Sequence, residues 1–393
     1  MLRNKEVTIS KKAKKRIEKG GLWIYRSEIQ EDISSIPVGE LVQVKTETEY
    51  IGRGYIHPKQ TISIRLLTQK NEPITSDLFE KKILTALDLR EKIQFPADEP
   101  RRLINSEGDN LPGLVLDQYG KILVFQIFTQ GMEKWKNLLL NLFKKIFHPS
   151  ALLEKSIGAL RKQEGLEEIC YLHFGEILQP ALFKIDGLSF WIDLLEGHKT
   201  GFYLDQRENR KKLKDYVKGG AFLDPFSYTG GMSLYAAAFG AAHVEAVEDS
   251  HKIIPLLEKN IQENKMKDRI LFFQGNAFHF LREKILEKKV YDTILLDPSS
   301  FAKNKKDFKK ALSGYKEIHL SALKLLHSGG FLITYSCSQN ITEKDFLEMI
   351  LEAAADTKRS LQIIERQGAS RDHPVRGGMP ETEYLKGFIF RVV

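Results

Sequence analysis

The chain has 393 residues, of which 42% are hydrophobic and 28% charged, a composition that argues against a disordered chain, a collagen or a coiled coil. Lysine and arginine number 60 against 52 acidic residues, and this net charge of +8 favours a polyanionic partner, with a basic but inert surface as the alternative. The sequence lacks both the roughly 18 apolar residues of a membrane-spanning helix and the apolar core of a signal peptide, so we expect a cytoplasmic protein without a membrane partner.

Residues 1–72 are predicted to form a small β-rich domain. Three short runs, at 41–44, 50–55 and 62–67, are rich in β-branched or aromatic residues and are separated by glycine, proline and charged residues. This pattern is typical of a compact barrel or sandwich. Residues 1–20 also contain eight lysines or arginines and only two acidic residues, which suits contact with phosphates.

Residues 73–180 are predicted to form a small α+β middle domain. Apolar residues recur at helical spacing over 78–94 and again over 132–147. Between them, residues 108–128 read as two strands joined by a tight turn at Tyr119-Gly120-Lys121.

Residues 181–393 alternate between strand and helix patterns and predict an α/β domain. Five apolar strands are expected, at 220–226, 243–248, 270–277, 291–298 and 328–337. Helical patterns follow the first, the second and the fourth of them. Such alternation implies parallel crossovers and a doubly wound sheet, in which ligands bind beyond the carboxyl ends of the strands.

Residues that suit a nucleoside cofactor stand at three of these strand ends. The first strand leads into a turn whose glycine lets the backbone approach a ligand closely. Glu248 ends the second strand, where a carboxylate can accept hydrogen bonds from a ribose diol. The alternative for each position is a loop cap or a polar surface. The candidate cofactor-binding residues in these three places are Asp224, Phe226, Tyr228, Gly230, Glu248, Asn276 and Ala277.

The motifs DPFSYTGG, GNAF and LDPSSF, with Glu248, resemble those of class I S-adenosylmethionine-dependent methyltransferases, which have a Rossmann-like fold. The segments TGFYLDQRENR, SGYKEIHLSALKLLHSGGFLITYSCS and YLKGF resemble the RlmI-type bacterial large-subunit ribosomal RNA cytosine-C5 methyltransferases. This resemblance implies an N-terminal PUA RNA-binding domain, S-adenosylmethionine as cofactor and ribosomal RNA as substrate. In one departure, Ser299 replaces the second proline of the family's Asp-Pro-Pro motif.

Cys337 is the candidate catalytic nucleophile. Cytosine C5 becomes nucleophilic only after a thiolate has added to C6, and Cys337 stands at the end of the fifth strand and matches the family's nucleophile. Asp297, at the end of the fourth strand, is the second candidate catalytic residue and is also expected to border the cofactor. It can hydrogen-bond the cytosine at N3 or at the exocyclic amine, or else merely cap a turn.

Other candidates flank this centre. Tyr203, Gln206 and Arg207 are expected to line the cofactor or base pocket, with a solvated helix start as the alternative. Cys170 is interpreted as a core residue of the middle domain. The sequence predicts no metal site, because it has only two cysteines and its histidines lack the spacing of metal ligands. Phosphate contact is expected from a lysine-rich run after Pro298, comprising Lys303, Lys305, Lys306, Lys309 and Lys310.

Two other functions stay open at this point. The first is methylation of a base nitrogen, in which Cys337 would be a bystander because a nitrogen nucleophile needs no covalent adduct. The second is an RNA-binding ribosome assembly factor with a vestigial catalytic domain. The sequence does not decide between a monomer and a homodimer.

Overall fold

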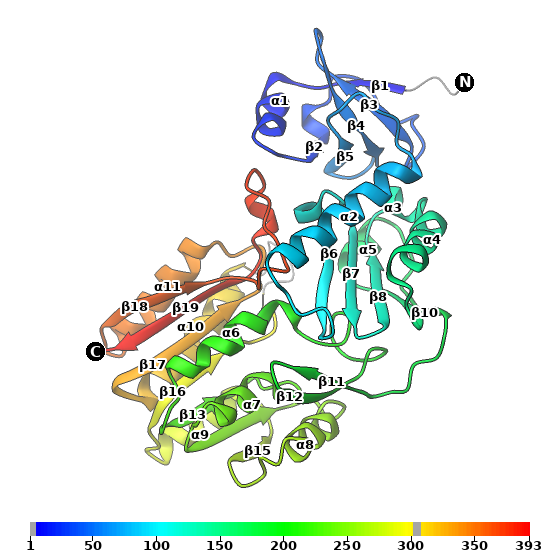
Figure 1. The fold of residues 1–393 in the computed structure, drawn as a ribbon. Helices are drawn as coiled ribbons and strands as arrows, with labels where there is room; N and C mark the ends of the chain where they lie inside the picture. The colour runs from blue at the N-terminus through cyan, green and yellow to red at the C-terminus, as the bar shows by residue number, and fades with distance from the viewer. Residues whose placement is uncertain (1–4, 302–307) are drawn as a thin grey trace. The chain divides into compact units, whose positions relative to one another are not determined.

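The computed structural model describes residues 5–301 and 308–393 (Figure 1). They form two compact units. The first unit comprises residues 1–183 together with 192–204 and 371–382, and the second comprises 184–191, 205–370 and 383–393. In the part of the chain that the structure describes, no helix combines the length and the apolar character needed to cross a bilayer.

The first unit begins with the predicted β-rich domain. Its five-stranded sheet has the order β1-β3-β4-β5-β2, and β1 pairs with β3 in parallel while the other pairs are antiparallel. The three predicted strands are β3, β4 and β5. The elements of this domain are β1 (Lys5–Thr8), α1 (Lys11–Glu18), β2 (Trp23–Tyr25), β3 (Leu41–Lys45), β4 (Tyr50–Ile56) and β5 (Ile62–Thr68).

A second five-stranded sheet, of order β10-β9-β8-β7-β6, forms the α+β part of the same unit. The predicted turn joins β7 to β8, and Gly120 in it has a φ of 58° that favours glycine. The elements here are α2 (Ser76–Lys92), β6 (Arg101–Asn105), β7 (Leu114–Tyr119), β8 (Ile122–Ile127), α3 (Gln130–Glu133), α4 (Lys136–Phe147), β9 (Ala151–Ser156), α5 (Ala159–Gln163) and β10 (Ile169–Phe174).

The helix predicted over 132–147 is broken into α3 and α4. Trp135 stands between the two helices, and its ring packs on that of Phe79 with a centroid distance of 5.0 Å. The apolar spacing continues across the break because residues on both sides face one core, which includes Met132 and Leu139.

The interpretation of Cys170 as a core residue is wrong. Cys170 is exposed and lies on β10, the edge strand of its sheet, where its sulfur is 3.9 Å from the carbonyl oxygen of Leu195. An edge strand has one neighbour instead of two, so alternation along the strand does not guarantee burial.

The second unit contains a seven-stranded sheet of order β15-β14-β13-β16-β17-β19-β18. All five predicted strands are present and run parallel to one another, as a doubly wound sheet requires. They are β13 (Ala221–Asp224), β14 (His243–Glu248), β15 (Ile270–Gln274), β16 (Tyr291–Leu296) and β17 (Leu326–Ser336).

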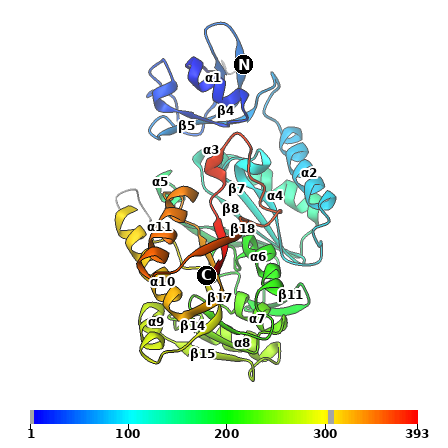
Figure 2. The ribbon, with the colours of Figure 1, turned by 90° about the vertical axis from the view of Figure 1, so that its left-hand side faces the viewer.

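Helices cover both faces of this sheet. Right-handed crossovers from the central strands β13 and β16 lead in opposite directions along the sheet, which places α7 and α10 on opposite faces (Figures 1 and 2). Apolar residues of α9, α10 and α11 form one core with the strands. The helices are α6 (Arg207–Lys212), α7 (Gly231–Ala238), α8 (Ile254–Glu263), α9 (Ala277–Leu286), α10 (Phe308–Leu325) and α11 (Glu343–Asp356).

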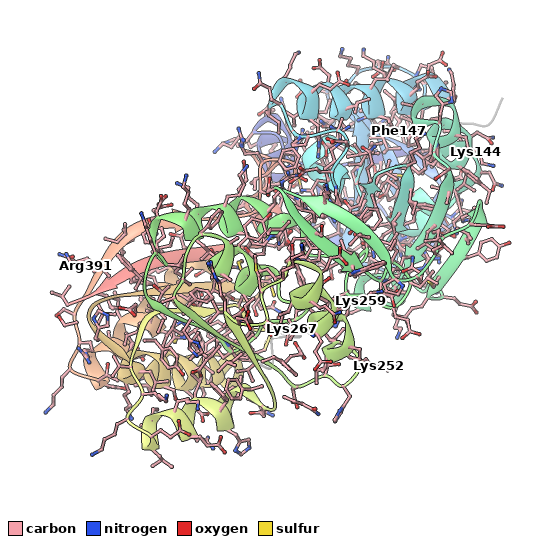
Figure 3. The ribbon with its side chains drawn as sticks, turned by 60° about the horizontal axis from the view of Figure 1, so that its bottom comes forward. Lys144, Phe147, Lys252, Lys259, Lys267 and Arg391 are labelled. Atoms are coloured by element: carbon pink, nitrogen blue, oxygen red, sulfur yellow. The ribbon has the colours of Figure 1, made fainter. Side chains whose placement is uncertain are left out.

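Among the described residues from 181 onward, four strands were not anticipated. β18 (Leu361–Gln367) and β19 (Lys386–Val392) complete the large sheet, and β19 lies antiparallel between β17 and β18. Near the end of β19, Arg391 is exposed while its two neighbours are buried (Figure 3). The others, β11 (Ala181–Ile185) and β12 (Leu188–Ile192), form a two-stranded sheet.

Candidate active site

Four neighbouring strands of the second unit carry polar or reactive side chains at their carboxyl ends. Asp224 ends β13 and Glu248 ends β14, whereas Asp297 directly follows β16 and Cys337 directly follows β17. These strands are parallel, so the four side chains lie along one edge of the sheet. Along this edge the four residues stand in the order Glu248, Asp224, Asp297 and Cys337.

The turn after β13 is held against β14. The backbone amide and the hydroxyl of Ser227 both donate to the carbonyl oxygen of Val247, at 3.0 and 2.9 Å. Tyr228 and Gly230 both have positive φ, of 49° and 86°, and a Cβ on Gly230 would lie 2.6 Å from Leu257 Cδ1. The glycine therefore satisfies both the turn and the close approach of α8.

Asp224 lies at the base of this turn with 1% of its surface exposed. Burial raises the pKa of its carboxyl to about 7, although the Ser233 hydroxyl donates to its Oδ2 at 2.7 Å. Its Oδ1 atom and the Oγ1 atom of Thr229 are buried without a hydrogen-bond partner among the described residues. Orphaned buried acceptors are costly, and they suit a bound ligand that supplies donors.

Glu248 is half-buried at the next strand end. Burial raises the pKa of its carboxyl, and this effect is opposed by backbone amides, among them that of Ser250 at 2.8 Å. Asn276 uses its Oδ1 to cap α9, accepting from the amides of Phe278 and His279 at 3.0 and 3.4 Å. The Oδ1 atom of Asn276 is thus a helix cap, which is the alternative considered for this position. Contact of Asn276 or of the buried Ala277 with a cofactor stays a prediction.

Asp297 is half-buried and is held from the segment before α6. Gln206 Nε2 donates to Asp297 Oδ2 at 2.9 Å, and Asn209 Nδ2 donates to Gln206 Oε1 at 2.6 Å. Gln206 is itself buried, so its amide orientation is fixed by both partners. The structure therefore brings together two of the predicted residues, Gln206 and Asp297.

Two further predicted residues have other partners. The Arg207 guanidinium is paired with Asp186, with the shortest contact at 2.7 Å, and the Tyr235 hydroxyl donates to the same carboxylate at 2.6 Å. Tyr203 belongs to the first unit, where its hydroxyl lies 3.0 Å from His198 Nδ1. Contact of Arg207 or Tyr203 with a cofactor stays a prediction.

The residues on either side of the half-buried Cys337 belong to a cluster of hydroxyl groups. Ser336 Oγ donates to the Tyr315 hydroxyl at 3.1 Å, and that hydroxyl is 3.2 Å from Ser338 Oγ. Ser300, in the loop after Asp297, lies 2.9 Å from the same Ser338 hydroxyl. These contacts join the loop after β16 to the loop after β17, and they fix the backbone on both sides of the thiol.

Sequence reasoning missed several members of this environment. Tyr315 and His319 are buried on α10 at a spacing of four residues, and burial lowers the pKa of His319 to about 4. His319 Nε2 lies 2.9 Å from Thr334 Oγ1 on β17. The spacing of Tyr315 and His319 by four residues on the apolar face of a helix was the signal in the sequence that could have identified them. Lys386, which donates to the carbonyl oxygen of Ser338, was missed for a different reason. This contact depends on the pairing of β19 with β17.

Of the lysine-rich run, Lys303, Lys305 and Lys306 lie outside the described residues, whereas Lys309 and Lys310 are exposed on α10. Within residues 5–301 and 308–393, no group of three or more histidine, cysteine or acidic side chains is arranged to hold a metal ion.

The strand-end residues fit S-adenosylmethionine. Asp224 and Thr229 offer buried acceptor atoms beside the glycine turn, and Glu248 offers a half-buried carboxylate one strand away. A cationic ligand with an amino group and a ribose diol supplies donors for such acceptors.

Replacing Glu248 with alanine is expected to weaken S-adenosylmethionine binding about tenfold or more, because a lost hydrogen bond to a charged group costs roughly 1.5–3 kcal/mol. Isothermal titration calorimetry measures this directly, with circular dichroism to check the fold. The exposed Glu258 on α8 offers a matched control, and Glu258→Ala should leave the affinity unchanged. Equal affinities for Glu248→Ala and wild type would remove Glu248 from the site.

Comparison with known proteins agrees with this site. Residues 7–69 match the family model of a PUA-like domain, and residues 156–391 match that of an S-adenosylmethionine-dependent methyltransferase. The ribosomal RNA large subunit methyltransferase I of Shewanella frigidimarina (strain NCIMB 400) is 36% identical over 382 residues, which cover 96% of each chain. The protein of the same name from Aliivibrio fischeri (strain MJ11) is 35% identical over 94% of this chain and 95% of its own.

Two solved structures share the fold over nearly the whole chain. A putative methyltransferase from Streptococcus mutans has a TM-score of 0.85 at 20% identity and covers 98% of this chain and 100% of its own. A second putative methyltransferase, SMU.776 in complex with SAH, has a TM-score of 0.87 at 22% identity with the same coverage.

These matches confirm the predicted fold class, in which a PUA-like domain and a small α+β domain precede a Rossmann-like methyltransferase domain. They also confirm S-adenosylmethionine as the cofactor. Two curated relatives match 96% of this chain at 36% and 37% sequence identity. The chain therefore belongs to the family of S-adenosylmethionine-dependent methyltransferases that includes the ribosomal RNA large subunit methyltransferase I proteins.

Proposed function

We propose that this protein forms 5-methylcytosine in large-subunit ribosomal RNA through a covalent adduct with Cys337. The names of the curated relatives support the substrate class. The observation that carries the cytosine-C5 reaction is the juxtaposition of a thiol and a carboxylate. Cys337 and Asp297 follow adjacent parallel strands, in which Leu296 pairs with Thr334, and their loops are joined by the contact of Ser300 with Ser338.

The proposed reaction begins with addition of the Cys337 thiolate to C6 of cytosine. The new S–C6 bond pushes the electron pair of the C5–C6 double bond to C5, and N3 takes up a proton as it does so. C5, now nucleophilic, accepts the methyl group that bound S-adenosylmethionine supplies. A base then removes the C5 proton, the C5–C6 double bond re-forms as the S–C6 bond breaks to return the thiolate, and N3 gives up the proton that it had taken up.

Asp297 is proposed to hold and polarise the base during the addition. Its Oδ2 atom accepts from Gln206, so the carboxylate is oriented before any substrate arrives. Hydrogen bonding to cytosine at N3 or at the exocyclic amine would favour the protonated ring as sulfur attacks C6. Preorganised groups of this kind lower the barrier because they need no reorientation during the reaction.

The modified nucleoside identifies the reaction. Ribosomal RNA from cells lacking the gene, incubated with the purified protein and S-adenosylmethionine, should gain one 5-methylcytosine, detected by nucleoside mass spectrometry and mapped by fragment masses. If the product is instead a base methylated on nitrogen, the proposed C5 reaction is wrong and the nitrogen-methylating alternative is favoured. Binding of S-adenosylmethionine without methylation of ribosomal RNA or assembling subunits would favour the assembly-factor alternative.

RNA affinity is proposed to come in part from α1. Lys14 and Arg16 are paired with Glu49 and Glu28, whereas the side chains of Lys11, Lys12 and Lys15 are exposed on the same helix. Each contact between a lysine and a phosphate releases counterions, which makes binding weaken as salt rises.

Deleting residues 1–72 is a poor test of this idea. Tyr55 and Leu67 of the β-rich domain are buried in one core with Phe79 and Leu103 of the α+β part. The Tyr55 hydroxyl also donates to the carbonyl oxygen of Pro112 at 2.8 Å. Removal of the domain would therefore expose apolar surface of what is left, and changes of surface charge are the cleaner experiment.

The triple change Lys11→Gln, Lys12→Gln and Lys15→Gln should weaken RNA binding and flatten the slope of log affinity against log salt by about 2, at about 0.7 per phosphate contact. Filter binding at several salt concentrations measures the slope. The matched control neutralises three exposed lysines around α8, Lys252, Lys259 and Lys267 (Figure 3), and should change the slope less. A slope unchanged by the α1 substitutions would assign this helix a different role, such as protein docking.

A further inference from the structure

Lys386 lies across the backbone that carries Cys337. It is the first residue of β19 and pairs with Ser336, the residue before the thiol. Its Nζ atom donates at 2.8 Å to the carbonyl oxygen of Ser338, the residue after the thiol. Lys386 is thus tied to both chain neighbours of Cys337, to Ser336 by strand pairing and to Ser338 by a hydrogen bond.

This ammonium group is buried, since only 7% of the surface of Lys386 is exposed. Burial of a cation is costly unless opposite charge lies near it. In the described part of the chain, no carboxylate lies within 4.0 Å of the Lys386 ammonium group, whose direct partner is the neutral carbonyl oxygen of Ser338. The ionisable groups that stabilise this buried cation therefore act on it from beyond ion-pair distance.

Burial lowers the pKa of Lys386, and three ionisable groups oppose this effect in part, namely Cys337, Glu383 and Glu343. Glu343 is half-exposed and already paired with Arg366, so its charge is shared and screened. Cys337 contributes the most of the three. A thiolate that favours the ammonium form of Lys386 is, by reciprocity, favoured by that ammonium.

Two other described groups at these strand ends, Tyr315 and Asp297, do not favour ionisation of the thiol. The Tyr315 hydroxyl approaches from α10 and is neutral, because burial raises its pKa to about 12. Asp297 follows β16, the strand next to β17, and the charges of both Asp297 and Cys337 help to raise the pKa of Tyr315. A carboxylate in this position opposes a second negative charge. Lys386 is a described cation at this end of the sheet that can offset the charge of Asp297.

We propose that Lys386 is a positioning residue that keeps Cys337 in the thiolate form and fixes the backbone around it. An ordinary cysteine is only a few per cent thiolate at neutral pH, and an adjacent cation increases that fraction. The inference rests on the proposed role of Cys337 as the nucleophile, but its central claim concerns the thiol alone and holds without RNA.

The thiol can be titrated in the free protein. Cys170→Ala removes the exposed second cysteine, so Cys337 becomes the only thiol that reacts with iodoacetamide. The rate of alkylation is measured against pH, and the ultraviolet absorbance of the thiolate gives an independent titration that does not depend on access of the reagent.

The variant Lys386→Gln in this background keeps a donor for the Ser338 carbonyl and removes the charge, whereas Lys386→Arg keeps the charge. Lys386→Gln is expected to raise the apparent thiol pKa by about one unit, because an opposite charge at close range shifts a pKa by roughly 1–3 units. The alkylation rate at neutral pH should fall about tenfold. Lys386→Arg should restore it to within about threefold, and the exposed Lys344→Gln on α11 should have no effect.

Two results would overturn the inference. The first is a thiol pKa that is the same in Lys386→Gln as in the parent protein, with S-adenosylmethionine affinity intact in both. The second is a shift that Lys386→Arg fails to reverse, which would mean that the lysine acts through packing rather than charge. Failure of the covalent mechanism is a separate result, since it appears as methylation by a Cys337 variant and not in the thiol titration.

Discussion

Replacement of Cys337 by alanine is expected to reduce methyl transfer below detection while S-adenosylmethionine still binds with near wild-type affinity. The proposed reaction at C5 requires a nucleophile at C6, and the thiolate is the side chain best suited to that addition. The cofactor candidates Asp224 and Glu248 stand on β13 and β14, whereas Cys337 follows β17 on the other side of β16. Loss of its sulfur should leave the cofactor contacts in place.

Incorporation of a radioactive methyl group into ribosomal RNA measures the first effect, and calorimetry measures the second. Cys170→Ala is the matched control, because Cys170 is the other cysteine of the chain and lies exposed on the edge strand of a different sheet. This control should retain nearly full activity. Methylation by Cys337→Ala at a rate close to wild type would exclude the covalent mechanism and favour methylation of a base nitrogen.

The second large effect is expected at Asp297. Asp297→Asn keeps the size of the side chain but removes its charge, and should lower kcat by about 10²–10⁴-fold, the range of general acid–base help. The KM for S-adenosylmethionine should rise less, unless the carboxylate also contacts the cofactor. Single-turnover rates at saturating RNA and cofactor separate these two effects.

Gln206 provides the comparison for Asp297. Its amide donates to Asp297 and accepts from Asn209, so Gln206→Ala should leave the carboxylate present but less well oriented. Loss of one hydrogen bond to a charged group corresponds to roughly a tenfold decrease in rate. If Asp297→Asn reduced kcat no more than Gln206→Ala does, the carboxylate would be a turn cap and not a participant in the reaction.

The strand ends of this site could be predicted from the sequence because the signals are local. Each buried parallel strand is a short apolar run, and the polar residue that ends it marks the edge of the sheet, as at Glu248 and Asp297. Because parallel strands present their carboxyl ends at one edge of the sheet, the linear pattern predicts that these residues share an edge, whereas the order of the strands along that edge comes from the structure.

Features that depend on pairing between distant segments could not be predicted in this way. Lys386 meets Ser336 and Ser338 only because β19 enters the sheet antiparallel to β17, a register that no local pattern encodes. The exposure of Cys170 likewise depends on the place of β10 at the edge of its sheet. Arg207 faces Asp186 because the turn between β11 and β12 supplies a carboxylate that the sequence did not mark.

Capture of the covalent adduct tests the central claim most directly. RNA carrying 5-fluorocytosine at the modified position should form, with S-adenosylmethionine present, a complex that survives denaturing electrophoresis, because fluorine at C5 cannot leave as the proton does. Mass spectrometry of the digested complex should locate the RNA on the peptide that contains Cys337. The adduct should form with wild type and Cys170→Ala and be absent from Cys337→Ala. An adduct on another residue, or normal turnover of the RNA without any adduct, would contradict the account.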